Sequence, residues 1–104
     1  MPGREKEPLF GISVTASLVD TTPRMLRAYE EADLITPHRT EGNTRLYSKK
    51  DIETLQVICF LHKEREVNLS GIKVIFEVVL FNNQDILESI AEIAPEMLER
   101  LKKI

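Results

Sequence analysis

The sequence predicts a mainly α-helical domain that contains one short antiparallel β-hairpin. Three observations lead to this prediction. Apolar residues recur at helical spacing through most of the chain, and helix-capping residues precede several of these stretches. One segment, "ITPHRTEGNTRLYS", changes instead to the turn chemistry and short alternating runs of a hairpin. With 104 residues, the chain is long enough for one small domain with a single core.

Two helices joined by a tight turn are predicted in the first part of the chain. Residues 1–10 are mostly charged or carry proline, so we expect a flexible N-terminal tail. A short helix follows in "ISVTASLVD", with Ser13 as its N-cap. The next helix has Thr22 as its N-cap and Pro23 at its first position, where the missing N–H is no loss.

The second predicted helix has two different faces. Its apolar residues follow at helical spacing and are Met25, Leu26, Tyr29, Ala32 and Leu34. Arg24 and Arg27 are three residues apart and share another face. The acidic residues Glu30, Glu31 and Asp33 lie in the second half, and we expect them to point toward solvent or toward the third and fourth helices.

The hairpin is predicted to pair residues 38–40 with residues 44–47. Pro37 ends the preceding element, and "EGN" supplies the turn. In the second strand Arg45 and Tyr47 point to one face, because side chains alternate along a strand. The hairpin is therefore a small wing with a cationic face.

Three more helices are predicted after the hairpin. Ser48 caps the third, with Asp51 completing a capping box, and this helix should end near Glu66. Asn68 caps the fourth, whose apolar residues recur at i, i+3, i+4, i+7 and i+8. The two helices should contribute most of the core.

The last segment, residues 84–104, is predicted to form a helix that packs along another helix. Its apolar residues have near-heptad spacing, which favours dimerisation through this segment. The residues that we expect in the dimer contact are Ile86, Ile90, Ile93, Met97 and Leu101. Pro95 should kink or break the helix, because it removes one hydrogen bond and clashes with the preceding turn.

Composition excludes several classes of function. The net charge is −3, yet residues 22–50 hold six basic and four acidic side chains, so a basic zone lies within an acidic chain. Cys59 is the single cysteine, which excludes an internal disulfide and a thiolate metal cluster; we expect it to be buried. No stretch is apolar for long enough to span a membrane, and no signal peptide is apparent, so we expect a cytoplasmic protein.

No catalytic constellation can be assembled from the sequence. A Ser/Cys–His–Asp set, a phosphate-binding loop and a pair of buried carboxylates are all missing, so we expect no enzyme and no cofactor. The order of elements points elsewhere. Two helices joined by a tight turn and followed by a hairpin form a winged helix-turn-helix, whose second helix enters the major groove of DNA. The winged helix-turn-helix should span residues 11–81.

The residues of this region also resemble a known family. "LRAYE", "ADLITPHRTEG", "RLYSKKDI" and "VNLSGIK" are similar to the DNA-binding domain of the MerR family of bacterial transcription regulators, and most similar to its heat-shock repressor subgroup, HspR. Arg27 with Tyr29, and Arg45 with Tyr47, match the R-x-Y patterns of the family's recognition helix and wing. The residues that we expect to bind DNA are Thr22, Arg24, Arg27, Tyr29, His38, Arg39, Arg45, Tyr47 and Lys49.

The resemblance implies a homodimeric repressor of heat-shock and chaperone genes. Such a protein would bind an inverted-repeat operator in double-stranded DNA, with the chaperone DnaK as corepressor. No small-molecule effector or metal is expected, since residues 84–104 hold no cysteine or histidine, and no membrane partner is expected either. The alternatives are a GlnR-like repressor of nitrogen metabolism, controlled by glutamine synthetase, and a non-catalytic protein-interaction or excisionase-like module.

Overall fold

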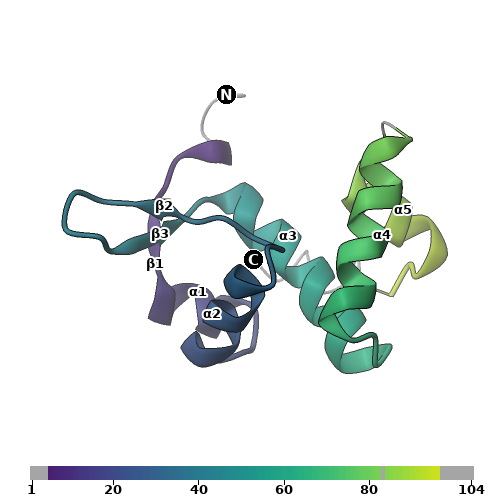
Figure 1. Ribbon diagram of the computed structural model, residues 1–104, viewed down its shortest axis with the longest axis horizontal. Helices are drawn as coiled ribbons and strands as arrows, with labels where there is room; N and C mark the ends of the chain where they lie inside the picture. The colour runs from purple at the N-terminus through teal and green to yellow at the C-terminus, as the bar shows by residue number, and fades with distance from the viewer. Residues whose placement is uncertain (1–4, 83, 97–104) are drawn as a thin grey trace.

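The computed structural model describes residues 5–82 and 84–96 of the chain. A central helix separates a part that contains the first two helices and a small sheet from a part that contains the last two helices (Figure 1). The elements in chain order are β1 (Phe10–Gly11), α1 (Ile12–Leu18), α2 (Pro23–Glu31), β2 (His38–Arg39), β3 (Arg45–Tyr47), the central α3 (Lys49–Cys59), a π-helical turn η2 (Phe60–Glu64), α4 (Leu69–Phe81) and α5 (Ile86–Ile93). The mainly α fold with an antiparallel hairpin wing is confirmed.

Hydrogen bonds from capping residues set where α2 and α3 begin. The Thr22 hydroxyl accepts a hydrogen bond from the Met25 backbone N–H at 3.1 Å, with Pro23 at the first position of α2. Ser48 and Asp51 form both hydrogen bonds of a capping box at the start of α3, each 3.0 Å long. These contacts need only residues close in sequence, and the predicted caps are confirmed.

The start of the fold differs from the prediction. Phe10 and Gly11 form a third strand, β1, which pairs antiparallel with β3, so that the strand order is β1-β3-β2. The Leu9 N–H also donates to the Tyr47 carbonyl oxygen at 3.0 Å. The end of the predicted N-terminal tail is therefore part of the sheet. Because the chain enters α1 directly from this strand, Gly11 is the N-cap, and the prediction of Ser13 as N-cap is wrong.

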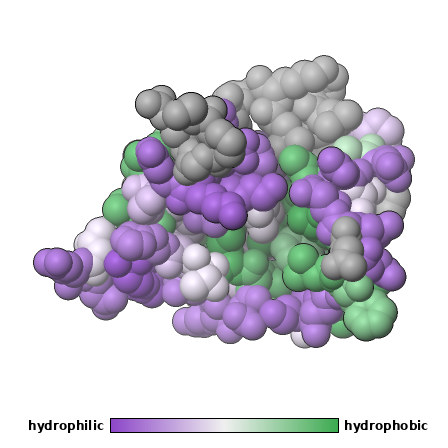
Figure 2. Space-filling model, turned by 90° about the horizontal axis from the view of Figure 1, so that it is seen from above, coloured by the Kyte–Doolittle hydropathy of each residue, from purple (hydrophilic) through white to green (hydrophobic). Residues whose placement is uncertain are grey.

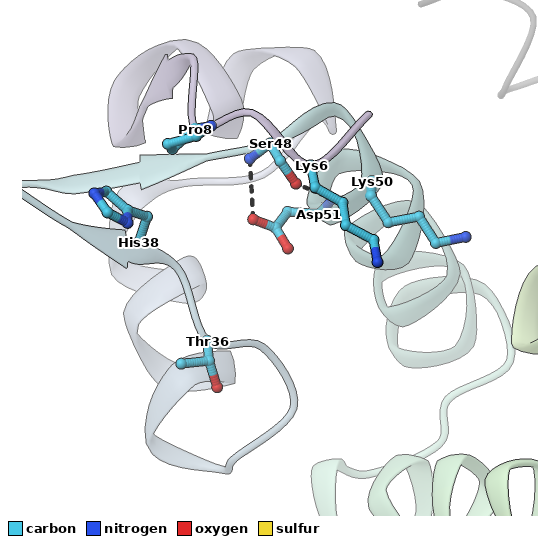
Figure 3. A pocket seen from close by; sticks show the side chains of 7 residues that line it. All are labelled: Lys6, Pro8, Thr36, His38, Ser48, Lys50 and Asp51. Carbon is cyan, nitrogen blue, oxygen red and sulfur yellow. Dashed lines mark hydrogen bonds between the residues drawn. The ribbon is translucent and has the colours of Figure 1, made fainter. Parts of the chain in front are cut away.

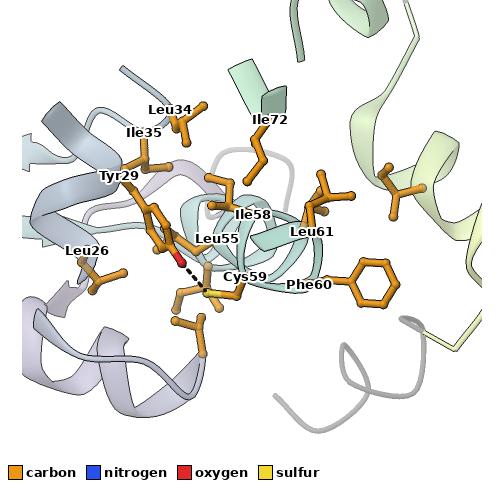
Figure 4. Close-up of a cluster of buried hydrophobic side chains, with 14 of the residues drawn as sticks. Leu26, Tyr29, Leu34, Ile35, Leu55, Ile58, Cys59, Phe60, Leu61 and Ile72 are labelled. Carbon is orange, nitrogen blue, oxygen red and sulfur yellow. Dashed lines mark hydrogen bonds between the residues drawn. The ribbon is translucent and has the colours of Figure 1, made fainter. Parts of the chain in front are cut away.

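The core surrounds α3. Its residues Leu55, Val57 and Ile58 are completely buried. Leu55 and Ile58 lie in one cluster with Leu26 and Tyr29 of α2 and Ile72 of α4 (Figure 4). Helix α2 is thereby held by its apolar face, which leaves its opposite face at the surface.

The last described helix packs onto its own chain. Helix α5 contacts α3 and α4, and Ile90 and Ala94 are buried in the core, with Ile86 packed against it. The expectation that Ile90 forms a dimer contact is therefore corrected, because its side chain fills the open side of α3 and α4. Ile86 is only partly buried, and its predicted role in a dimer stays a prediction. Met97 and Leu101 lie outside the described residues, as does the side chain of Ile93. The helix ends at Ile93, shortly before Pro95.

Helix α4 is apolar on more than its buried side. Ile72 and Val79 face the core, while Val74, Val78, Leu80 and Phe81 are exposed. Figure 2 shows hydrophobic surface at the end of the molecule that α4 and α5 form. Among the helices that the structure describes, none has the length and apolar character that crossing a membrane requires.

Candidate nucleic-acid interface

The N-terminal half of α2 presents free positive charge. Arg24 and Arg27 are exposed, and neither forms an ion pair with any residue that the structure describes. The helix is anchored from behind by Leu26, which is completely buried. The dipole of the helix adds partial positive charge at the same end, where Thr22 caps it. An anion that approaches this end meets two guanidinium groups that need not break another contact first.

The wing arginines have a different environment. Glu30, in the second half of α2, accepts a hydrogen bond from Arg45 Nε at 2.6 Å with one carboxylate oxygen and from Arg39 Nη2 at 2.9 Å with the other. Burial raises the pKa of Glu30, but the hydrogen bonds from Arg45 and Arg39 outweigh it and hold the pKa of this carboxyl below its ordinary value. The cationic face of the wing is therefore turned toward α2.

Two of the three acidic residues at the end of α2 and just after it have partners within the chain. Asp33 accepts a hydrogen bond from Lys73 Nζ of α4 at 2.9 Å, so its predicted orientation toward the fourth helix is confirmed. Glu30 lies against the wing, and the expectation that it points to solvent or to the later helices is wrong. The sequence held one signal for this contact, since two arginines of a short hairpin need a counter-charge nearby.

Tyr29 and Tyr47 are core residues in the structure. Both side chains are completely buried, so the expected direct contact of these two residues with DNA is corrected. The Tyr29 hydroxyl lies 3.3 Å from His62 Nδ1. It also lies 3.8 Å from Cys59 Sγ (Figure 4). Burial raises the pKa of both phenols. Tyr29 lies two residues after Arg27, and Tyr47 lies two residues after Arg45, so each buried tyrosine anchors the segment that carries one of these arginines.

His38 and Lys49 lie at the surface, and His38 lines a shallow depression of about 340 Å³. His38 lines one wall, and Lys6 and Lys50 lie over the start of α3 on the other (Figure 3). Lys50 is within 3.7 Å of Asp85 and 3.8 Å of Glu53, which offsets part of its charge. The depression lies between β2 and the start of α3. It extends the basic surface beyond the hairpin.

The described part of the chain gives little support for a metal site or for a reactive thiol. No group of three or more metal-ligating side chains occurs among the described residues. Cys59 is buried, as expected for a small apolar filler, and its sulfur faces the hydroxyl of Tyr29. The exposed, unpaired cations of α2 therefore remain the strongest feature for binding a ligand, and that ligand would be an extended anion.

Comparison with known proteins identifies similar sequences over the same region. Residues 10–78 match the family described as MerR HTH family regulatory protein. The chain is 42% identical over 74 residues to "Putative heat shock protein HspR" of Streptomyces coelicolor, a match that covers 71% of this chain and 49% of that protein. It is 40% identical over 70 residues to "HTH-type transcriptional regulator GlnR" of Bacillus anthracis and of Bacillus cereus, covering 67% of this chain and 54% of each. The chain spans about half the length of these relatives.

Proposed function

Because the chain belongs to the MerR family of helix-turn-helix regulators, we propose that it represses heat-shock and chaperone genes as a sequence-specific DNA-binding protein. As a member of this family it is a transcription regulator and not an enzyme. One observation carries the proposal. Arg24 and Arg27 are exposed and unpaired within the described chain, on the helix that follows the tight turn. Guanidinium groups suit this role because they bind phosphates and guanine edges in a bidentate manner.

The proposed binding mode uses two elements. The N-terminal half of α2 enters the major groove, where Thr22, Arg24 and Arg27 meet phosphates and base edges. The wing lies on the adjacent backbone with His38, Arg39 and Arg45, and Lys49 extends the contact at the start of α3. Tyr29 and Tyr47 support these residues from the core. The protein would act in the cytoplasm, where a bacterial operator lies.

Salt-dependent binding to duplex DNA tests this proposal. We expect Arg24→Gln with Arg27→Gln to weaken binding and to reduce the slope of log affinity against log salt by about 2, because each phosphate contact contributes about 0.9. The control is Arg65→Gln with Lys73→Gln, which removes the same charge from two surface ion pairs outside the N-terminal half of α2 and the wing. Equal slopes for the two double variants would refute the proposed interface.

The heat-shock assignment rests on similarity. The Streptomyces relative is named as a heat shock protein, and the triplet Arg27-Ala28-Tyr29 favours the same subgroup. We propose an inverted-repeat operator and DnaK as corepressor. Footprinting of the operator with and without DnaK tests the corepressor; identical protection in both experiments would refute it. The GlnR-like alternative is carried by the 40% identity to those relatives, and a gene located beside glutamine synthetase would support it instead.

The proposal includes a homodimer, and the exposed side of α4 supports it. Val74, Val78 and Phe81 lie on one helical face, and Phe81 is 86% exposed. With Leu80, these side chains form a small apolar patch, in which Phe81 alone can bury about 150 Å² or more. A standard interface needs about 800 Å² per partner, so a second copy docked here would form a weak dimer that a two-fold operator strengthens. We therefore place the dimer contact on α4 rather than on the buried stripe of α5.

A further inference from the structure

We propose that Glu30 is a specificity-determining residue, which lowers affinity for non-operator DNA by holding Arg39 and Arg45 away from phosphates. The inference rests on the proposed DNA-binding function. It concerns a residue that would not itself touch DNA, and it assigns different roles to two sets of arginines. Arg24 and Arg27 would be available to any duplex, while the wing arginines would be released only when a phosphate displaces the Glu30 carboxylate.

The geometry of the contact supports this exchange. Each carboxylate oxygen of Glu30 accepts from one arginine, at 2.6 Å for Arg45 and 2.9 Å for Arg39. Both are charge-assisted hydrogen bonds, which are stronger than neutral ones, and the bond from Arg45 is short. The Glu30 side chain is only 23% exposed, so solvent and salt screen the contact less than they screen an ordinary surface pair. A phosphate must therefore be well placed to replace it.

The sheet register gives a reason for the contact to form. Arg39 on β2 and Arg45 on β3 are direct cross-strand partners, and like charges in that position destabilise a hairpin. Glu30 lies between them and offsets their repulsion in the free protein. A DNA phosphate carries the same sign of charge as the carboxylate and can offset the same repulsion. The wing thus needs one anion, which is Glu30 in the free protein and a phosphate in the specific complex.

This arrangement changes how many charges act on random DNA. A loosely placed duplex attracts Arg24 and Arg27, which have no ion pair with a described residue, but does not recover the cost of separating Glu30 from the wing. An operator that seats α2 in the groove brings its flanking phosphates against the wing in a fixed position. Only the operator therefore recovers the cost of separating Glu30 from the wing. The chain gains specificity for the operator in this way without an additional base contact.

The test compares Glu30→Gln with Glu31→Gln in the full chain. Both variants lose one negative charge from adjacent positions, but Glu31 is exposed and forms no ion pair with a described residue, which makes it a matched control. The probe is a random-sequence DNA duplex, with binding followed by fluorescence anisotropy across a range of salt. We expect Glu30→Gln to bind more tightly and to steepen the salt slope by about 1 to 2, since each additional phosphate contact adds about 0.9. Glu31→Gln should leave the slope unchanged.

A second background keeps the test decisive if Glu30→Gln disturbs the wing. In a chain that already carries Arg39→Gln and Arg45→Gln, Glu30→Gln should no longer alter the slope. A persisting effect there, a shallower slope for Glu30→Gln alone, or equal slopes for Glu30→Gln and Glu31→Gln would each overturn the inference. If the unmodified chain fails to bind the duplex even at low salt, the proposed DNA-binding function fails. If it binds and only the Glu30 comparison fails, that function stands without this inference.

Discussion

Tyr29→Phe and Tyr47→Phe each remove a buried phenol hydroxyl, but they should change the stability of the fold in opposite directions. Tyr29 and Tyr47 are both completely buried, but the Tyr29 hydroxyl has His62 and Cys59 as partners. The Tyr47 hydroxyl has no hydrogen-bond partner among the residues that the structure describes. Tyr29→Phe therefore removes a formed contact, whereas Tyr47→Phe removes a polar group that is buried without compensation.

The magnitudes follow from the energetics of buried hydroxyls. A net hydrogen bond contributes about 1 kcal/mol, so Tyr29→Phe should lower the free energy of unfolding by about that amount. An unpaired buried polar group costs about 1–3 kcal/mol, so Tyr47→Phe should raise the free energy of unfolding by at least about 1 kcal/mol. For a domain near this size, 1 kcal/mol shifts Tm by about 4–8 °C. The two variants should thus melt about 8 °C or more apart.

Urea and thermal unfolding, followed by circular dichroism, measure both changes. Because both hydroxyls are buried, neither substitution should weaken DNA binding at a given fraction of folded protein. If Tyr47→Phe destabilises the chain, or if it lowers DNA affinity while the fold is retained, the hydroxyl has a partner and the reasoning is refuted. A loss of DNA affinity in Tyr29→Phe would likewise contradict its assignment to the core.

Two further predictions concern Glu30 and α4. The folded pKa of Glu30 lies below its unfolded value, so its contribution to stability is present above the ordinary glutamate pKa of about 4.3 and is lost as pH falls through the folded pKa. The stability difference between the unmodified chain and Glu30→Gln should therefore shrink between neutral pH and about pH 3 in urea unfolding; a constant difference contradicts the ion pair. Phe81→Glu should abolish dimerisation in sedimentation velocity while changing monomer stability by less than about 0.5 kcal/mol, because Phe81 is exposed. A dimer that persists in this variant would move the contact away from α4.

Local chemistry explains which features could be predicted from the sequence. The caps at Thr22, Ser48 and Asn68 each use a partner three residues away, so their sequence patterns were sufficient. The apolar face of α2 also follows from periodicity alone. The same reasoning identified Arg24 and Arg27 as exposed, because they occupy the face opposite to that stripe.

The features that were missed depend on contacts between distant residues. Strand β1 has only two residues, and it exists because β3 offers a free edge far along the chain. The stripe of α5 has the same spacing whether it packs on its own chain or on a second one, so periodicity could not distinguish a core contact from a dimer contact. Glu30 reaches Arg39 and Arg45 across nine and fifteen residues. Tyr47 is buried in a strand that pairs with β1 and packs near α1, both far away in the sequence.

The most direct test of the central claim is a map of backbone amide chemical shifts while duplex DNA is added to the isotope-labelled chain. The account predicts that the largest changes fall on residues 22–27 at the start of α2 and on residues 38–47 of the wing, with smaller changes at the start of α3. Amides of α4 near Val74 and Val78 should change only if the dimer forms on DNA. The largest changes on α4, with none on α2, would contradict the proposal that α2 and the wing form the DNA interface.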